Sequence, residues 1–316
     1  MKIEEYELDF SQTASDIADL DIKQWREKYP LDYFKMAALI NYVDKTLPVK
    51  DAYISAFKIL YTATRRYIPD LLYKYVSLSN DKASNEKRFS TLQNRTLYLS
   101  KVEGFNDPFD GKAFYYDPDR FQTFNWLRPY NGRIIDDFSS YIRIVALTEN
   151  DVNSLPMWAH YANNHSGFCI AYNMKDNPDL YSTIYQVQYT EQRLDITTFL
   201  ERHASTLENL NQNEGEKLIR SISLPIVHMS MLLSCIKNSS WSYEKEYRCI
   251  ASTRTEGMPY MEANASEIYI GMNCDHEHVK RLLEIGYTLK IPVYKMTFDE
   301  VSPDYKFSVK PVLMSK

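Results

Sequence analysis

Two glutamates two positions apart mark the part of the sequence best suited to chemistry. Glu244 and Glu246 lie in the stretch from Trp241 to Ile250, whose second half is apolar and rich in strand-forming residues. If this stretch is a strand, side-chain alternation puts both carboxylates on one face, roughly 6.6 Å apart. Like charges at that distance raise each other's pKa, and such pairs are typical of acid–base or cation-stabilising sites. The alternative is a solvated strand entrance with alternating charges at Glu244, Lys245 and Glu246.

Other kinds of site find less support in the sequence. His276 and His278 are the clustered histidines, but side chains two residues apart on a helix diverge, so no metal site is predicted. Cys169 lies in an apolar run and is predicted to be an inert buried thiol, not a nucleophile paired with His160 or His165. The sequence contains no GxGxxG, GxxxxGK[ST] or GxSxG motif.

The composition is that of a soluble globular protein. The 316 residues are 44% hydrophobic and 25% charged, and the net charge of −5 argues against non-specific nucleic-acid binding by the whole surface. The 26 tyrosines suit β-strands and stacking on rings, whereas the 8 glycines argue against a glycine-rich phosphate loop. Widely spaced cysteines, with no signal peptide and no membrane span expected, predict a cytoplasmic location.

Residues 1–70 are predicted to form a helical N-terminal appendage. Helical spacing is found over 15–25 and 31–43, and a third helix is expected to start at Pro48 and to end before Pro69. These helices could bind a partner protein, or they could cover an open side of the main domain.

Residues 71–316 are predicted to form one α+β domain. Strands are expected at 71–76, 96–100, 142–147, 167–172, 186–189, 247–251, 267–270 and 292–298. Helices are expected at 85–92, 156–162, 192–237 (broken at 211–215) and 276–284, and an irregular loop at 111–140. Because the strands are grouped around few helices, a mixed, largely antiparallel split sheet is favoured over a doubly wound fold.

The loop 104–110 is turn-rich and polar enough to bind a ligand through Asn106. The alternative is a structural turn, in which Asn106 and Asp107 bond their own backbone while Phe105 and Phe109 fill the core.

Arg248 also has two interpretations. It is expected to pair with an acid such as Asp107 or Asp110, and it could instead hold a pyrophosphate. Trp158 and Trp241 are expected to be packing residues.

The chemistry that suits the glutamate pair best is cleavage at an electron-deficient sugar carbon. Breaking the bond between ribose and nicotinamide develops an oxocarbenium-like cation, which a carboxylate such as Glu246 would stabilise. At about 4 Å and an effective dielectric near 20 the attraction is roughly 4 kcal/mol, or about a thousandfold in rate. Tyrosines would offer flat surfaces to nicotinamide and adenine.

Four separated blocks, in order, resemble a bacterial family catalogued as domain of unknown function 2971. The blocks are Leu72-Tyr73-Lys74-Tyr75, Phe105-Asn106-Asp107-Pro108-Phe109-Asp110, Met157-Trp158-Ala159-His160-Tyr161-Ala162 with Gly167-Phe168-Cys169-Ile170, and Trp241-Ser242-Tyr243-Glu244-Lys245-Glu246-Tyr247-Arg248. The resemblance covers about 71–260 and implies no activity by itself.

The same chain resembles the ADP-ribosyltransferase superfamily of the Arg–Ser–Glu type. Lys74 stands at the basic position of an early strand, where that branch prefers arginine, and Thr148 stands at the Ser/Thr position, without the Ser-Thr-Ser triplet. Glu244-Lys245-Glu246 matches the Glu-x-Glu motif. The resemblance implies an ADP-ribosyltransferase-like fold and NAD as substrate. Glu246 would be the catalytic glutamate that holds the ribose 2′-OH, and Glu244 would position or deprotonate the acceptor.

If NAD is the substrate, it is expected to contact seven further residues, of which His160 and Tyr161 have no counterpart in the superfamily and are expected at the nicotinamide pocket. They are Lys74, Tyr75, Asn106, Thr148, His160, Tyr161 and Arg248.

The function expected from the sequence is therefore NAD-dependent ADP-ribosyl transfer to a protein or nucleic-acid acceptor, as in a toxin or an anti-phage effector. One alternative is a non-catalytic binding module of a defence or signalling system that contacts a partner through residues 1–70. Another is a Mg²⁺-dependent nuclease using Asp107, Asp110 and Glu246.

Overall fold

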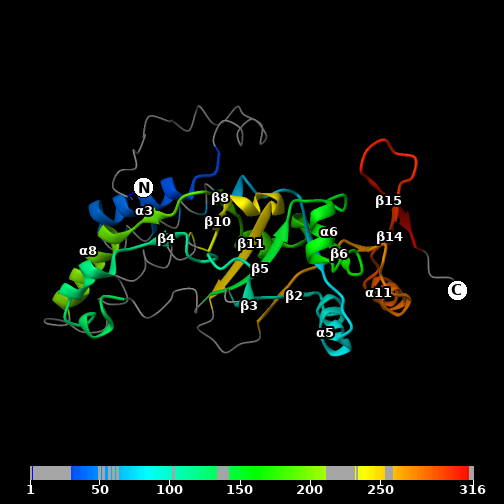
Figure 1. The fold of residues 1–316 in the computed structure, drawn as a ribbon, viewed down its shortest axis with the longest axis horizontal. Helices are drawn as coiled ribbons and strands as arrows, with labels where there is room; N and C mark the ends of the chain where they lie inside the picture. Colours follow the sequence, from blue (N-terminus) through cyan, green and yellow to red (C-terminus); the bar gives the residue numbers. More distant parts are fainter. Residues whose placement is uncertain are drawn as a thin grey trace.

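Figure 1 shows a computed structural model of the chain. It describes residues 2, 30–48, 51, 54, 55, 58, 61, 64–101, 104–133, 142–210, 232, 234–252 and 259–312. The architecture is mixed α+β with an open, mostly antiparallel sheet, as the grouping of strands predicts. The helices α3 and α8 lie at one end of the molecule, and α11 lies with β14 and β15 at the other (Figure 1).

The main sheet has nine strands in the order β15-β14-β13-β6-β1-β5-β11-β7, with β3 also paired to β5. All of these pairs are antiparallel except β13 with β14. The strands are β1 (Leu71–Val76), β3 (Ser100–Lys101), β5 (Ile142–Thr148), β6 (Phe168–Asn173), β7 (Ile184–Gln186), β11 (Glu246–Ser252), β13 (Glu267–Ile270), β14 (Val293–Phe298) and β15 (Phe307–Pro311).

Three short two-stranded sheets flank the main one. They pair β2 (Thr96–Tyr98) with β12 (Tyr260–Glu262), β8 (Gln188–Thr190) with β10 (Ile236–Asn238), and β4 (Phe114–Tyr115) with β9 (Leu194–Asp195). The first is antiparallel and the other two are parallel.

The described residues also form helices, several of which begin at residues with helix-starting chemistry. They are α3 (Tyr33–Thr46), α5 (Lys82–Gln93), α6 (Leu155–Tyr161), α7 (Pro178–Thr183), α8 (Thr197–Leu210) and α11 (His276–Leu289), with 3-10 helices η3 (Pro118–Thr123), η4 (Arg128–Tyr130), η6 (Met174–Asp176) and η7 (Ser239–Glu244). The carboxylates of Asp32, Asp81 and Asp275 accept backbone N–H bonds as N-caps of α3, α5 and α11. Pro156 occupies the first turn of α6, as predicted.

The sheet is split between β1 and β5. Strand β1 pairs with β6 along its whole length, but among the described residues it pairs with β5 only at Tyr73 and Thr148. Farther along β5, the same side of the strand is taken by β3, from Ile144 onward. On this side of β5, residues 145–147 therefore have no paired strand among the described residues, because β3 pairs before them and β1 after them. The Lys74 ammonium crosses this gap and donates to the Ala146 carbonyl at 3.2 Å.

The two faces of the sheet bury different clusters. One face, with Leu72, Leu147 and Tyr247, packs under α5 and α11. The other packs Tyr75 and Cys169 against α6, where Trp158 is fully buried and donates to the Val152 carbonyl at 2.8 Å. Trp158 is thus a packing residue, as predicted, and burial raises the pKa of the Cys169 thiol, which fits an inert thiol.

The described part of the N-terminal region packs on the main domain. The helix predicted over 31–43 is α3, and its Tyr33, Phe34 and Ile40 share a core cluster with Phe114 and Phe199. The helix predicted over 15–25 lies outside the described residues, and the third helix is described only at isolated helical positions from 51 to 65. A partner-binding role for residues 1–70 stays a prediction.

Some sequence-based assignments were wrong. The helical pattern predicted over 192–237 holds for α8, but Ile236–Asn238 form β10, while 211–231 lie outside the described residues. The loop predicted over 111–140 contains β4, η3 and η4 in its described part. Strands β12 and β15 and helix α7 were missed because each is short and lacks a clear period.

Candidate functional site

The glutamate pair sits on a turn rather than within a strand. Asn238 caps η7 by accepting from the Ser240 N–H, Glu244 ends that 3-10 helix, and Lys245 has a left-handed φ of 43°. Strand β11 starts only at Glu246. The predicted strand alternation at these residues is therefore wrong, because the polar segment before Glu246 satisfies its backbone in a capped turn.

The two carboxylates nevertheless converge, and a lysine joins them. Lys237 Nζ lies 2.6 Å from Glu244 Oε2 and 3.2 Å from Glu246 Oε2. All three side chains are buried, and the Lys237 ammonium also stands 4.7 Å from the centre of the Trp241 ring. Sequence reasoning missed Lys237. Its signal was a lysine directly after the apolar Cys235 and Ile236, which a solvated helix face does not explain.

Arg248 anchors the other side of Glu246. Its guanidinium is fully buried, with Nε 2.8 Å from Glu246 Oε1 and the two terminal nitrogens 2.5 and 2.7 Å from the oxygens of Asp110. It also donates to the Ser234 carbonyl at 2.7 Å and lies over the Phe105 ring. The predicted ion pair with Asp110 is confirmed. The alternative role, holding a pyrophosphate, is not supported, because these partners enclose the guanidinium.

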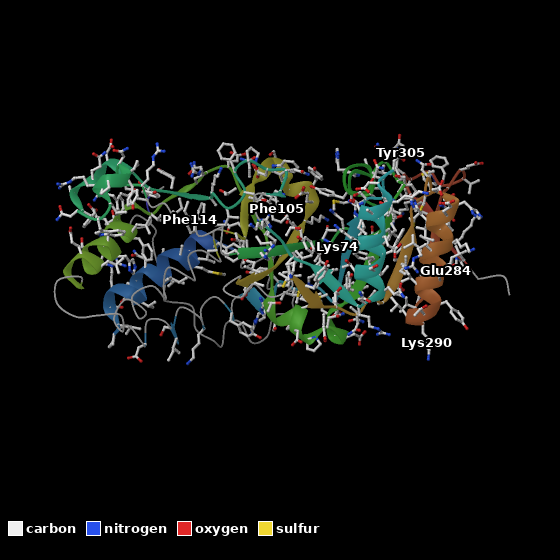
Figure 2. The ribbon with its side chains drawn as sticks, turned by 90° about the horizontal axis from the view of Figure 1, so that it is seen from below. Lys74, Phe105, Phe114, Glu284, Lys290 and Tyr305 are labelled. Carbon is white, nitrogen blue, oxygen red and sulfur yellow. The ribbon has the colours of Figure 1, made fainter. Side chains whose placement is uncertain are left out.

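A cavity of about 190 Å³ opens beside the glutamates, in the split between β1 and β5. Phe105 and Lys74, which both line it, lie near the middle of the molecule between the ends that carry Phe114 and Glu284 (Figure 2). Seven of the nine predicted site residues line this cavity: Lys74, Tyr75, Asn106, Thr148, Tyr161, Glu244 and Glu246.

The other two predicted residues do not line it. Arg248 stands behind Glu246, and His160 lies exposed on α6 with its ring 6.1 Å from that of Tyr243. His160 is therefore neither a core residue nor a wall of the cavity. Its neighbour Tyr161 lines the cavity and donates its hydroxyl to Glu244 Oε1.

Thr148 acts on the turn that carries Glu244. Its hydroxyl donates to the Glu244 carbonyl at 2.5 Å, and the Asn150 amide donates to the same carbonyl at 3.1 Å. The Glu246 N–H donates to the Tyr189 hydroxyl at 2.8 Å. These bonds fix the backbone on both sides of Lys245, so the positions of the two carboxylates are preorganised.

The environments of the two glutamates push their pKa values apart. Burial alone would raise the pKa of Glu246, but Arg248 and Lys237 bring it down to about 2. For Glu244, burial prevails over the hydrogen bonds from Lys237 and Tyr161, and its pKa is raised. Glu246 is thus a permanent anion, and Glu244 is the better proton acceptor or donor.

Burial also lowers the pKa of Lys74 to about 8, although Glu246 favours its charged form. Lys74 is therefore a cation at neutral pH, and it loses its proton at a lower pH than an ordinary lysine does.

The low pKa of Glu246 predicts acid sensitivity. Because the pKa is about 2 in the folded state and 4.5 in the reference state, the unfolded chain binds more protons between these values. The contribution of Glu246, about 3 kcal/mol by linkage, is complete above pH 4.5 and is lost as pH falls toward 2. Urea unfolding at pH 7 and pH 3 should show this loss in wild type and a smaller one in Glu246→Gln. Equal losses in the two proteins would contradict the assignment.

The loop that carries Asn106 is partly a structural turn. Asp107 Oδ1 accepts from the Phe109 N–H at 2.9 Å, as the structural interpretation predicts. Phe105 is half-buried over Arg248, but Phe109 is 59% exposed and does not fill the core. Asn106 is exposed at the mouth of the cavity, where it stays available to a ligand.

The nuclease alternative would need carboxylates grouped for a metal ion. Among the described residues, no group of three or more His, Cys, Asp or Glu side chains could hold one. The oxygens of Asp110 and Glu246 are bonded to Arg248, and Asp107 Oδ1 is used in the turn. The arrangement does not favour this alternative.

A second, larger cavity of about 700 Å³ adjoins the first. The two share Lys74, Tyr75, Tyr98, Ser100, Phe105, Asn106 and Tyr161 in their linings. The larger cavity extends from β1 to α5 and to the strands β2 and β12.

The comparison with known proteins matches part of the chain to a family model and indicates no activity. No curated protein and no solved structure matches the chain. In the described part of the chain, no helix has the length and apolar character needed to cross a membrane. The resemblance to ADP-ribosyltransferases stays a prediction. Residues 157–249, which contain Tyr161, Lys237 and both glutamates, match the family model "Protein of unknown function (DUF2971)", and this segment belongs to that family.

Proposed function

We propose that the protein cleaves the bond between nicotinamide and ribose in NAD and transfers ADP-ribose to an acceptor, within an ADP-ribosyltransferase-like split sheet. The observation that carries this proposal is the pair of buried glutamates with opposed pKa shifts beside a cavity in the split. A fixed anion and a group able to exchange a proton are the two parts that glycosyl transfer requires.

Glu246 takes the role of the anion. As the bond from ribose C1′ to the nicotinamide nitrogen breaks, its electron pair leaves with neutral nicotinamide and positive charge develops on the ribose ring. Glu246 stays ionised at any ordinary pH, and Arg248 and Lys237 hold it in place. These two cations also offset part of its charge, so the stabilisation it offers is smaller than that of an unpaired carboxylate.

Glu244 takes the role of the base. Its raised pKa suits it to accept the proton of the acceptor nucleophile as the nucleophile bonds to C1′. Tyr161 and Lys237 each bond one of its oxygens, which fixes the carboxylate at the wall of the cavity. With water as acceptor, the same steps give NAD hydrolysis and free ADP-ribose.

The test is incubation of the protein with labelled NAD and cell extract. Wild type is expected to release nicotinamide and to label an acceptor or form free ADP-ribose. Glu244→Gln should lower the rate by about a hundredfold or more, the range for a lost general base, because an amide cannot take the proton. Glu262→Gln, an exposed glutamate on β12, is the matched control and should keep the wild-type rate. No NAD loss and no transfer by wild type would reject the proposal.

A non-catalytic binding module is the second candidate, and one observation favours it. Both carboxylates are held in ion pairs with buried cations, an arrangement that also occurs in purely structural networks. In that case a partner captured by the full chain would be lost when residues 1–70 are deleted, and Glu244→Gln would have no effect on its capture.

A further inference from the structure

The two adjoining cavities differ in charge. The smaller one carries Glu244 and Glu246 together with Lys74 and Lys237, so its charges balance. The lining of the larger one includes the cations Lys74, Lys87 and Arg88 and no acidic side chain. Lys74 belongs to both, and only the larger cavity has an excess of positive charge in its lining. Such a cavity concentrates anions, and its low-dielectric walls strengthen the attraction.

Helix α5 forms the basic wall of the larger cavity, because the spacing of its polar residues places them on one face of the helix. Ser84, Lys87, Arg88 and Thr91 recur at intervals of three, four and seven residues and line the larger cavity together. The buried Asn85 and Phe89 belong to the side of α5 that packs on the domain, and the buried Leu92 also lines the cavity.

The acidic residue Glu86 of the same helix is engaged outside the cavity. It does not line the cavity, and its carboxylate pairs with Arg281 of α11 at 3.0 Å. No acidic side chain of α5 therefore lines the cavity beside the basic residues.

Arg88 is held in place by Asn85. One terminal nitrogen donates to Asn85 Oδ1 at 3.1 Å, and Asn85 is itself fixed by bonds with the backbone N–H and carbonyl of Ser79 at 3.1 and 2.7 Å. Neither Arg88 nor Lys87 forms an ion pair with any residue that the structure describes. A planar guanidinium fixed on one side is suited to bidentate binding of a phosphate on the other.

Aromatic rings form the opposite wall. Tyr98 of β2 and Tyr260 of β12 face each other across the strand pair, with ring centres 5.4 Å apart, and both are more than 40% exposed. Tyr172 also lines the cavity. Exposed rings beside phosphate-binding groups can stack on a heterocyclic base.

We propose that the larger cavity binds the phosphates and base of a nucleoside diphosphate, with Lys87 and Arg88 on the phosphates and Tyr98 and Tyr260 beside the base. This deepens the proposed function and rests on it for the natural ligand, which would be the ADP half of NAD. The nicotinamide riboside half would then lie beyond Lys74, against the glutamates. Binding of ADP itself does not depend on any cleavage step.

The experiment is calorimetric titration of the full chain with ADP. Wild type is expected to bind ADP, and Arg88→Gln should weaken binding by about ten- to a hundredfold, the range for a hydrogen bond to a charged group. Lys87→Gln should weaken it less, because a flexible ammonium forms a single point contact. Lys82→Gln is the matched control, because Lys82 is exposed on the same helix and does not line the cavity.

The base is tested separately. Tyr98→Ala should weaken the binding of ADP and have little effect on the binding of inorganic pyrophosphate, whereas Arg88→Gln should weaken the binding of both. Unchanged thermal unfolding midpoints would show that each variant is folded. The inference fails if wild type does not bind ADP, if Arg88→Gln binds it as well as Lys82→Gln does, or if a single-stranded oligonucleotide binds in preference to ADP.

The outcomes separate this inference from the proposed function. ADP binding that depends on Arg88, together with intact NAD after incubation, would keep the nucleotide site and reject the transferase. Cleavage of NAD at an unchanged KM in Arg88→Gln would keep the transferase and reject the nucleotide site.

Discussion

Replacing Arg248 by methionine is expected to lower the free energy of unfolding by about 3–5 kcal/mol, the usual cost of removing one partner from a buried ion pair. Methionine fills much of the volume but supplies no charge. Asp110 and Glu246 would then remain buried without the guanidinium, which now makes bonds of 2.5 to 2.8 Å to them. Lys237 reaches Glu246 but no oxygen of Asp110. Asp110 would therefore lose the positive charge that now offsets its own, whereas Glu246 would keep that of Lys237.

Urea unfolding at pH 7 measures this loss. Arg281→Met is the matched control, because Arg281 pairs with Glu86 at the surface, where both side chains are at least 30% exposed. A surface pair contributes at most about 1 kcal/mol, so the control should stay close to wild type. If Arg248→Met and Arg281→Met lose the same free energy, the buried network does not stabilise the fold as inferred.

Replacing Glu246 by glutamine is expected to lower the rate of nicotinamide release by about a hundred- to a thousandfold. An unshielded carboxylate about 4 Å from the developing cation would give the upper figure, and the pairing with Arg248 and Lys237 reduces it. Glutamine keeps the shape of the side chain and can still accept the bond from Arg248 Nε. The lost term is therefore mainly the negative charge facing the cavity.

The measurement is single-turnover release of nicotinamide from saturating NAD, with folding checked by circular dichroism. Glu149→Gln is the matched control, because Glu149 is an exposed glutamate that directly follows β5 and does not line the cavity. A rate for Glu246→Gln within threefold of wild type would exclude Glu246 as the stabilising anion. Equal losses of rate in Glu246→Gln and Glu149→Gln would point to a general effect on folding.

Much of the sheet could be predicted because its strands follow the simple rules. The runs at 71–76, 142–147 and 267–270 consist mostly of apolar residues and appear as β1, β5 and β13 with nearly the same bounds. Lys74 could be placed near the glutamates only through a family resemblance, and Tyr161 only as an expected wall of a nicotinamide pocket. Nothing in their local sequence indicates the gap between β1 and β5.

The chemistry of the pair could not be predicted in full because it depends on long-range partners. Lys237 is seven residues from Glu244, but it reaches the site through the parallel pairing of β10 with β8. Asp110 comes from a loop 138 residues before Arg248. The opposed pKa shifts follow from these two contacts, and neither contact has a signature in the spacing of Glu244 and Glu246.

The divergence of β1 from β5 also has a consequence for how a ligand is recognised. Thr148 of β5 pairs with β1, and Ile144 pairs with β3. Residues 145–147 lie between these two pairs and border the cavity, and among the described residues no strand neighbours them on that side. Peptide groups there can bond to a guest as one strand bonds to the next, once the guest displaces Lys74 from the Ala146 carbonyl. Because every residue type except proline offers the same amide and carbonyl, this part of the recognition would persist through most side-chain replacements.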